Sequence, residues 1–134
     1  MRRLCAGLLF LPTLGGCAEP PYTSVNNTEL KALLAQGVPI YDIRRPDEWR
    51  QTGVVQGSQK LTLVDEGSHV DPEFYTTLTK RVRRDQPDIV ICRSGRRSST
   101  LVRELMERQG YTHVYNVKQG VTGWITQANS VVHN

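Results

Sequence analysis

The apolar residues of this chain fall into short blocks of two kinds. Continuous apolar runs, such as residues 89–91, are typical of strands that are buried on both faces. Elsewhere apolar residues recur every three to four positions, as Leu101, Leu105 and Met106 do, which is typical of one face of a helix. The expected strands are 22–25, 38–44, 60–64, 89–91 and 114–117, and the expected helices run from Asn26 or Asn27 to Gly37, from Pro46 through Trp49, over 71–84, and from Arg97 to Gly110.

This alternation of short strands and helices predicts an α/β domain. The central sheet should be mostly parallel, with about five strands flanked by helices in a three-layer arrangement. Ligands bind at the carboxyl ends of the strands in such sheets, so the loops that follow the strands are the first place to look for chemistry.

The clearest candidate chemistry lies in residues 92–98, Cys-Arg-Ser-Gly-Arg-Arg-Ser, between an apolar run and an amphipathic helix. Backbone N–H groups in such a loop and in the first helical turn have no intrahelical partners. They should converge on the loop centre, where the helix dipole is also positive. Gly95 allows the backbone to fold inward, and the side chains of Arg93, Arg96 and Arg97 add positive charge.

A thiol at the mouth of this loop should ionise more easily than a free cysteine, and the site would hold an incoming anion beside the sulfur. We therefore favour a nucleophilic Cys92 with a built-in anion cradle. The alternative is a buried structural cysteine followed by a solvated, basic helix start. We would favour that alternative if the glycine and the three arginines were missing.

The first 17 residues have the pattern of a targeting segment. Two arginines precede an apolar stretch over residues 4–14, which is too short to span a bilayer as a stable helix. Leu14-Gly15-Gly16-Cys17 resembles a bacterial lipoprotein processing site, in which the chain is cut before the cysteine and the cysteine is lipidated. The alternative is an ordinary secretory signal that is cut near Ala18.

This interpretation divides the chain into a signal peptide (1–17), a tether (18–22), a folded domain (23–128) and a C-terminal tail (129–134). The protein would be lipid-anchored in a bacterial cell envelope and would face the periplasm. In a Gram-negative host, Ala18 in place of aspartate favours the outer membrane.

Composition narrows the function classes further. The chain has 134 residues, enough for one domain, and a formal net charge of +4, two charges of which lie on Arg2 and Arg3 in the targeting segment. We therefore expect no nucleic-acid partner. The three cysteines allow no internal disulfide framework, and the three histidines lack metal-ligand spacing, so we expect neither metal nor cofactor.

Residues 92–98 resemble the active-site loop of the rhodanese family, the single-domain sulfurtransferases, and the resemblance extends over roughly residues 23–126. Asp42-Ile43-Arg44 resembles the family's Asp-x-Arg motif, while Val54 stands where the family usually has a histidine. The resemblance implies that Asp42 and Arg44 support the loop. Asp42 either accepts hydrogen bonds from loop N–H groups or orients an arginine, or else it forms a plain surface salt bridge. We expect Trp49 to pack in the core.

The resemblance implies a catalytic Cys92 that carries a persulfide. Sulfur would pass from a small anionic donor, such as thiosulfate, to a thiol or cyanide acceptor. In this interpretation Arg93 and Arg96 hold the donor, with Ser94 and Gly95 shaping the loop. Arg97 braces the loop, and Ser98 caps the helix or donates to the persulfide.

Two other function classes stay open. Cysteine phosphatases place five residues between cysteine and arginine, whereas four separate Cys92 from Arg97, so the smaller loop favours a sulfur atom over a phosphoryl group. A phosphatase or arsenate-reducing enzyme is the first alternative. A non-enzymatic module that carries sulfur or binds a partner is the second. We expect a monomer whose membrane contact is its lipid anchor.

Overall fold

The computed structural model describes residues 23–134, so the expected signal segment, Cys17 and the tether lie outside the described residues. Five strands form one sheet in the order β1-β5-β4-β2-β3, and every pairing is parallel. The predicted α/β fold with a central parallel sheet is confirmed. The strands are β1 (Thr23–Val25), β2 (Ile40–Asp42), β3 (Gln59–Lys60), β4 (Asp88–Ile91) and β5 (Val114–Val117).

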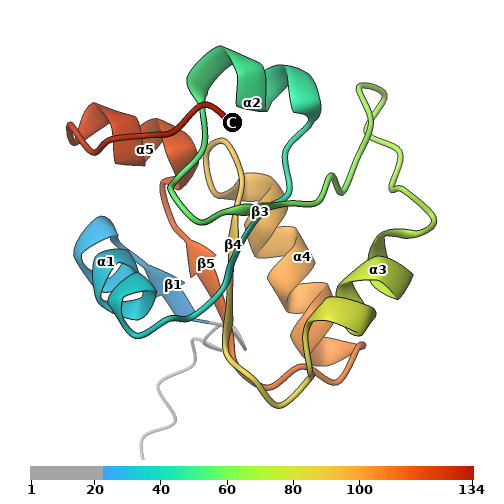
Figure 1. Ribbon diagram of the computed structural model, residues 1–134. Coiled ribbons are helices and arrows are strands. Elements are labelled where there is room, and N and C mark those ends of the chain that lie inside the picture. The colour runs from blue at the N-terminus through green and yellow to red at the C-terminus, as the bar shows by residue number, and fades with distance from the viewer. Residues whose placement is uncertain (1–22) are drawn as a thin grey trace, which may run out of the picture.

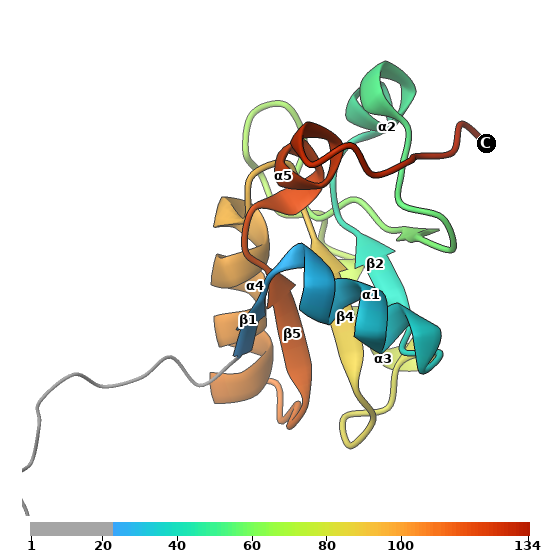
Figure 2. The ribbon, with the colours of Figure 1, turned by 90° about the vertical axis from the view of Figure 1, so that its left-hand side faces the viewer.

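Helices cover both faces of this sheet and give three layers. Figure 1 views the sheet nearly edge-on, with α1 and α5 on one side and α3 and α4 on the other. Figure 2 shows α1 in front of the sheet and α4 behind it, on the side of β1. The helices are α1 (Asn27–Ala35), α2 (Pro46–Thr52), α3 (Phe74–Arg81), α4 (Arg96–Glu107) and α5 (Gly120–Thr126).

The apolar core is divided into two clusters by the sheet. Ile89 and Ile91 of β4 belong to the cluster on the side of α1 and α5. Val90 and Cys92 belong to the cluster on the side of α3 and α4. This alternation follows from the two-residue period of a strand, and it explains why the whole 89–91 run is apolar.

Element boundaries differ from the prediction at several places: β2 covers only Ile40–Asp42 of the expected 38–44, and α5 was not expected. The helix expected over 71–84 begins at Phe74 and ends at Arg81, because Val82 adopts an extended conformation (φ −123°, ψ 123°). The strand expected over 60–64 is reduced to Gln59–Lys60. Beyond it, the N–H groups of Leu61 and Leu63 still donate to carbonyls of the neighbouring chain segment at 42–43.

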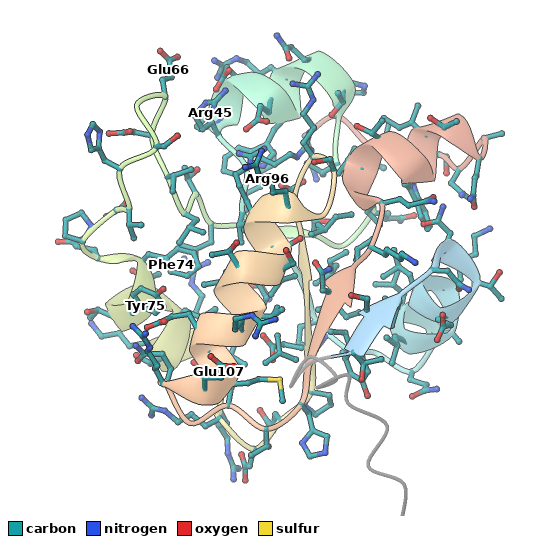
Figure 3. All side chains as sticks on the ribbon, turned by 180° about the vertical axis from the view of Figure 1, so that it is seen from behind. Arg45, Glu66, Phe74, Tyr75, Arg96 and Glu107 are labelled. Carbon is teal, nitrogen blue, oxygen red and sulfur yellow. The ribbon has the colours of Figure 1, made fainter. Side chains whose placement is uncertain are left out.

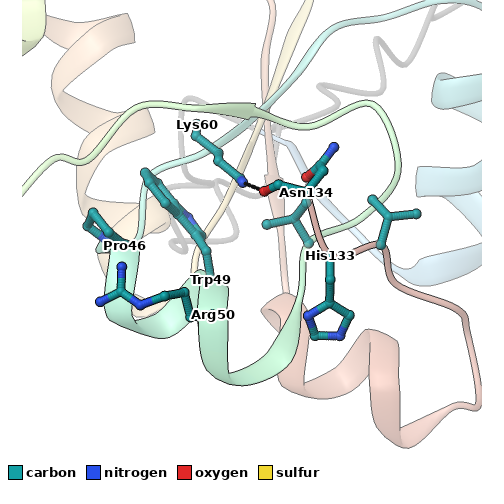
Figure 4. A pocket seen from close by; sticks show the side chains of 8 residues that line it. Pro46, Trp49, Arg50, Lys60, His133 and Asn134 are labelled. Carbon is teal, nitrogen blue, oxygen red and sulfur yellow. Dashed lines mark hydrogen bonds between the residues drawn. The ribbon is translucent and has the colours of Figure 1, made fainter.

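The positions of Trp49 and of the C-terminal segment also differ from the prediction. Trp49 is half-buried outside both apolar clusters, so the expectation that it packs in the core is wrong. It lines a cavity of about 330 Å³ with Lys60, whose ammonium lies 5.6 Å from its ring centroid (Figure 4). Residues 132–134, part of the segment expected as a tail, line this cavity. Val132 exchanges two backbone hydrogen bonds with Val54 (2.9 and 2.8 Å).

The amino end of β4 buries an acid without partners. Asp88 is fully buried, and neither of its carboxylate oxygens has a hydrogen-bond partner. Burial disfavours the charged carboxylate, which raises the pKa of Asp88 from 3.8 to about 7. This end of the sheet is opposite to the carboxyl ends of the strands.

We expect Asp88→Asn to remove a pH-dependent loss of folding stability. Because the pKa of Asp88 is higher in the folded state, the free energy of unfolding should fall as pH rises from about 4 to about 7 and then level off. The difference between the ordinary and the folded-state pKa of Asp88 corresponds to at most about 4 kcal/mol of unfolding free energy. In denaturant titrations across this pH range, the unfolding free energy of the variant should therefore rise relative to that of wild type. Asp85→Asn, at an exposed carboxylate paired with Arg83, is the matched control and should keep the wild-type slope. Parallel curves for wild type and Asp88→Asn would contradict this account.

Candidate active site

Cys92 follows β4 directly and lies on the floor of the loop. It continues the alternation of the strand, so its side chain enters the same layer as Val90, and only 1% of the residue is exposed. The expectation of a thiol at the mouth of the loop is therefore wrong. The sulfur lies beneath the loop because residue 92 still faces the layer between the sheet and α4.

Backbone N–H groups surround this sulfur. The N–H of Gly95 donates to Cys92 Sγ at 3.2 Å, and the N–H of Ser98, in the first turn of α4, donates at 3.4 Å. The hydroxyl oxygen of Ser98 lies 3.3 Å from the same sulfur. The loop thus curls around Cys92, and its donors are aimed at the place where negative charge would form.

Two glycines allow the loop to curl so tightly. Gly95 adopts a left-handed conformation (φ 92°), and a Cβ atom there would lie 2.1 Å from the carbonyl oxygen of Lys118. Gly120, at the start of α5, also has a positive φ (61°), and a Cβ there would lie 2.4 Å from the carbonyl oxygen of Arg93. The loop is therefore pressed against the turn between β5 and α5, and no side chain fits at either contact.

The start of α5 also satisfies the carbonyls of the loop. The N–H groups of Val121 and Thr122 donate to the carbonyl oxygens of Cys92 and Arg93, at 3.0 Å each. These bonds fix the direction of the peptide groups between residues 92 and 94, directly before the peptide group that carries the Gly95 N–H.

The three arginines of the loop have different surroundings. Arg93 and Arg96 are exposed, and within residues 23–134 neither of them makes an ion pair. Figure 3 shows Arg96 at the start of α4, with Glu107 at the far end of the helix. Arg97 is half-buried and binds Glu48 of α2 through two hydrogen bonds of 2.6 and 2.9 Å. Two cationic side chains are thus available at the rim, and the third is held by a partner.

The partner of Arg97 was not identified from the sequence. Burial by itself would raise the pKa of Glu48, but hydrogen bonds from Arg97 and from the N–H of Arg45 outweigh it and hold the pKa at about 2. Glu48 is therefore ionised at neutral pH and pairs with a cation that is always charged. Glu48 is the third residue of a predicted helix, and it accepts a hydrogen bond from the N-cap N–H. This position was the only sign in the sequence that Glu48 has a structural role.

Asp42 and Arg44 form a buried ion pair behind α2. Their side chains are 0% and 1% exposed, so the surface salt bridge considered above is wrong, and Asp42 accepts no hydrogen bond from the loop. Instead Asp42 orients Arg44, which donates to Thr52 Oγ1 at 2.9 Å and to the carbonyl of Gly53 at 3.0 Å. The pair thereby fixes the end of α2, the helix that carries the partner of Arg97.

Ser98 has a role other than helix capping. Gly95 occupies the N-cap position, while the hydroxyl of Ser98 is fully buried and donates to Asn116 Oδ1 of β5 at 2.5 Å. Asn116 was missed too, although a polar residue at an inward position of the apolar stretch 114–117 was a usable signal. Within the described part of the chain, no three His, Cys, Asp or Glu side chains gather in a way that would hold a metal ion.

Comparisons with known proteins agree with this geometry. The family model of the Rhodanese-like domain matches residues 26–127. A Schizosaccharomyces pombe protein named "Putative thiosulfate sulfurtransferase, mitochondrial" is 32% identical over 114 residues, which cover 81% of this chain and 78% of that protein. The Arabidopsis thaliana protein "HIGH ARSENIC CONTENT 1, mitochondrial" is 28% identical over 97 residues, covering 71% of this chain and 57% of that protein's length. The crystal structure of a rhodanese-related protein from Thermoplasma volcanium is 26% identical, with a TM-score of 0.65, covering 84% of this chain and all of that chain.

We expect Gly95→Ala to disrupt the loop far more than strain alone would. Gly37 has a similar positive φ (81°), but no atom lies within 4 Å of a Cβ built there, so Gly37→Ala is the matched control. The control should lose about 1 kcal/mol of unfolding free energy from backbone strain. Gly95→Ala should lose at least about 3 kcal/mol, because a backbone carbonyl must also move. Denaturant unfolding measures both losses, and equal losses would show that the contact with Lys118 does not shape the loop.

Proposed function

The chain belongs to the rhodanese-like domain family, and from this premise we propose that it is a sulfurtransferase that carries a persulfide on Cys92. One observation supports this proposal above the others: two backbone N–H groups and one hydroxyl lie within 3.4 Å of the Cys92 sulfur. The two N–H groups stabilise a sulfur anion without any change in the protein at the moment of reaction.

In the first half of the reaction, the Cys92 thiolate attacks the outer sulfur of thiosulfate. The sulfur–sulfur bond of the donor breaks, its electron pair leaves with sulfite, and a persulfide anion remains on Cys92. Arg93 and Arg96 are suited to hold the donor because they are exposed at the rim and carry charges that no carboxylate of residues 23–134 neutralises. The buried position of Cys92 means that the outer sulfur must enter the ring of loop N–H groups.

In the second half, a thiol or cyanide attacks the outer sulfur of the persulfide. The new bond forms as the bond to Cys92 breaks, and the thiolate is restored. This is a ping-pong scheme, in which the enzyme alternates between two covalent states. The loop needs no further cofactor for either half.

Phosphoryl transfer is less compatible with the loop. Its spacing is one residue shorter than that of cysteine phosphatases, and the guanidinium of Arg97 is directed at Glu48. A phosphate in the loop would therefore lack the arginine that such enzymes use. A non-enzymatic sulfur carrier would share the Cys92 chemistry and differ only in turnover.

Mass spectrometry after thiosulfate treatment tests the proposal. We expect one added sulfur atom on Cys92 in wild type and none in Cys92→Ser, followed by removal of the sulfur with cyanide. Steady-state turnover with cyanide then separates an enzyme from a carrier, which would react only once or slowly. Absence of the adduct together with phosphate release from a test ester would instead identify a phosphatase.

We also propose that Cys17 carries a lipid that anchors the domain in a bacterial cell envelope, facing the periplasm. The motif at 14–17 supports this proposal, and an anchor of several acyl chains binds a membrane firmly. Among residues 23–134, no helix combines the length and the apolar character needed to cross a membrane.

Cys17→Ala should abolish lipidation and release the protein from the membrane fraction. Cys5→Ala changes the other leader cysteine, which lies outside the processing motif, and is the matched control that should remain membrane-bound. Membrane fractionation and metabolic labelling with a fatty acid give the two readouts. If Cys17→Ala still fractionates with the membrane, the anchor assignment is wrong.

A further inference from the structure

A chain of hydrogen bonds connects the Cys92 sulfur with the edge of the sheet. Ser98 Oγ lies 3.3 Å from Cys92 Sγ and donates to Asn116 Oδ1 at 2.5 Å, and Asn116 Nδ2 donates to Ser24 Oγ at 3.2 Å. We infer that Asn116 is a positioning residue that sets whether the Ser98 hydroxyl donates to the sulfur or accepts from it. This inference rests on the proposed sulfur transfer at Cys92.

The fold holds the members of this chain in line. Asn116 of β5 is the register partner of Ser24 on one side and of Val90, two residues before Cys92, on the other. Ser98 and Asn116 are 0% and 3% exposed, whereas Ser24 is exposed on the edge strand β1. The chain therefore runs from a closed site at the sulfur to a hydroxyl that can exchange hydrogen bonds with water.

The hydroxyl of Ser98 has a single hydrogen, so it can serve only one acceptor at a time. In the arrangement found here, that hydrogen goes to Asn116, and Ser98 offers a lone pair to the sulfur. A lone pair suits a protonated thiol, which can donate to it. It opposes a sulfur that carries negative charge and has no hydrogen.

The opposite arrangement needs only a half-turn of the Asn116 side-chain amide. Nδ2 would then donate to Ser98, Ser98 would donate to the sulfur, and Ser24 would donate to Oδ1. Every hydrogen bond is remade, because hydroxyls both donate and accept and because an amide carries both kinds of group in nearly the same shape. The two arrangements match the protonated thiol of Cys92 and the thiolate that must form before it attacks a sulfur donor.

The other partners of the sulfur cannot adapt in this way. The N–H groups of Gly95 and Ser98 only donate. Arg97 is close enough for the charge of Cys92 to help raise its pKa, but the larger cause is its hydrogen bond with Glu48, which also holds it in place. Ser98 is thus the adjustable contact of the sulfur, and Asn116 controls it.

Two substitutions at Asn116 should act in opposite directions. Aspartate only accepts, so Asn116→Asp keeps the Ser98 hydrogen away from the sulfur. Leucine removes the competing acceptor, so in Asn116→Leu the hydroxyl turns toward the sulfur. We expect alkylation of Cys92 by iodoacetamide at neutral pH to slow about tenfold in the first variant and its pH profile to move to higher pH. In the second, the profile should move to lower pH. Shifts of both variants in the same direction, or no shift, would overturn the inference.

A double-mutant cycle separates this relay from a direct effect of charge. In a Ser98→Ala background, Asn116→Asp and Asn116→Leu should leave the alkylation profile unchanged, because the group through which they act is gone. An undiminished effect of Asn116→Asp there would mean that its charge acts on the sulfur through space, which also overturns the inference. Ser99→Ala, whose hydroxyl donates to the carbonyl of Arg96 at 2.9 Å, is the matched control and should behave as wild type.

Thermal unfolding checks that each variant is folded. If the buried charge of Asn116→Asp prevents folding, the leucine variant with and without Ser98 decides the question.

Alkylation needs no sulfur donor, so the two proposals fail separately. Absence of a sulfur adduct with opposite alkylation shifts would reject sulfur transfer and keep the Ser98–Asn116 relay. Normal adduct formation with unchanged alkylation profiles would reject the relay alone.

Discussion

The direction of two peptide N–H groups is the constraint on which this site depends. The donors at Gly95 and Ser98 face Cys92 Sγ, while the carbonyls of Cys92 and Arg93 in the same loop are bound on the other side by the first turn of α5. That contact is possible only where residue 95 lacks a side chain, with the carbonyl of Lys118 2.1 Å from a built Cβ. The sulfur site is therefore a product of the packing of β4, β5 and α5, and the loop sequence supplies only part of it.

A second layer of charges holds the same loop from the side of α2. Asp42 fixes Arg44, Arg44 fixes the end of α2, and Glu48 of α2 binds Arg97. Buried ion pairs add little net stability, because the loss of hydration offsets most of their attraction. Their geometry is exacting, however, since each guanidinium binds in a planar, two-pronged manner. We therefore infer that this network serves to position the start of α4 and adds little to the stability of the fold.

Sequence patterns were sufficient for the features that depend on neighbours along the chain. The parallel sheet and the start of a helix at Asn26 or Asn27 follow from local periodicity and residue type. The partners of Glu48 and Asn116 could not be found in this way, because they are 49 and 18 residues away. The burial of Cys92 and the outward position of Trp49 also depend on which face of an element meets the sheet. Those faces are set by the three-dimensional packing.

The buried polar groups of this domain differ in how they are satisfied. At the carboxyl ends of the strands, Ser98, Asn116 and Asp42 have partners for their side-chain oxygens. At the amino end of β4, Asp88 has none, and burial holds it largely as a neutral acid up to about pH 7. A buried polar group costs free energy unless it is hydrogen-bonded, so partners are expected where polarity is needed. Ser98 and Asn116 provide such partners beside the sulfur, whereas Trp49 Nε1 of α2 and Ser58 Oγ are buried without partners, so full pairing of buried polar groups is a feature of the sulfur site and not of the whole carboxyl edge of the sheet.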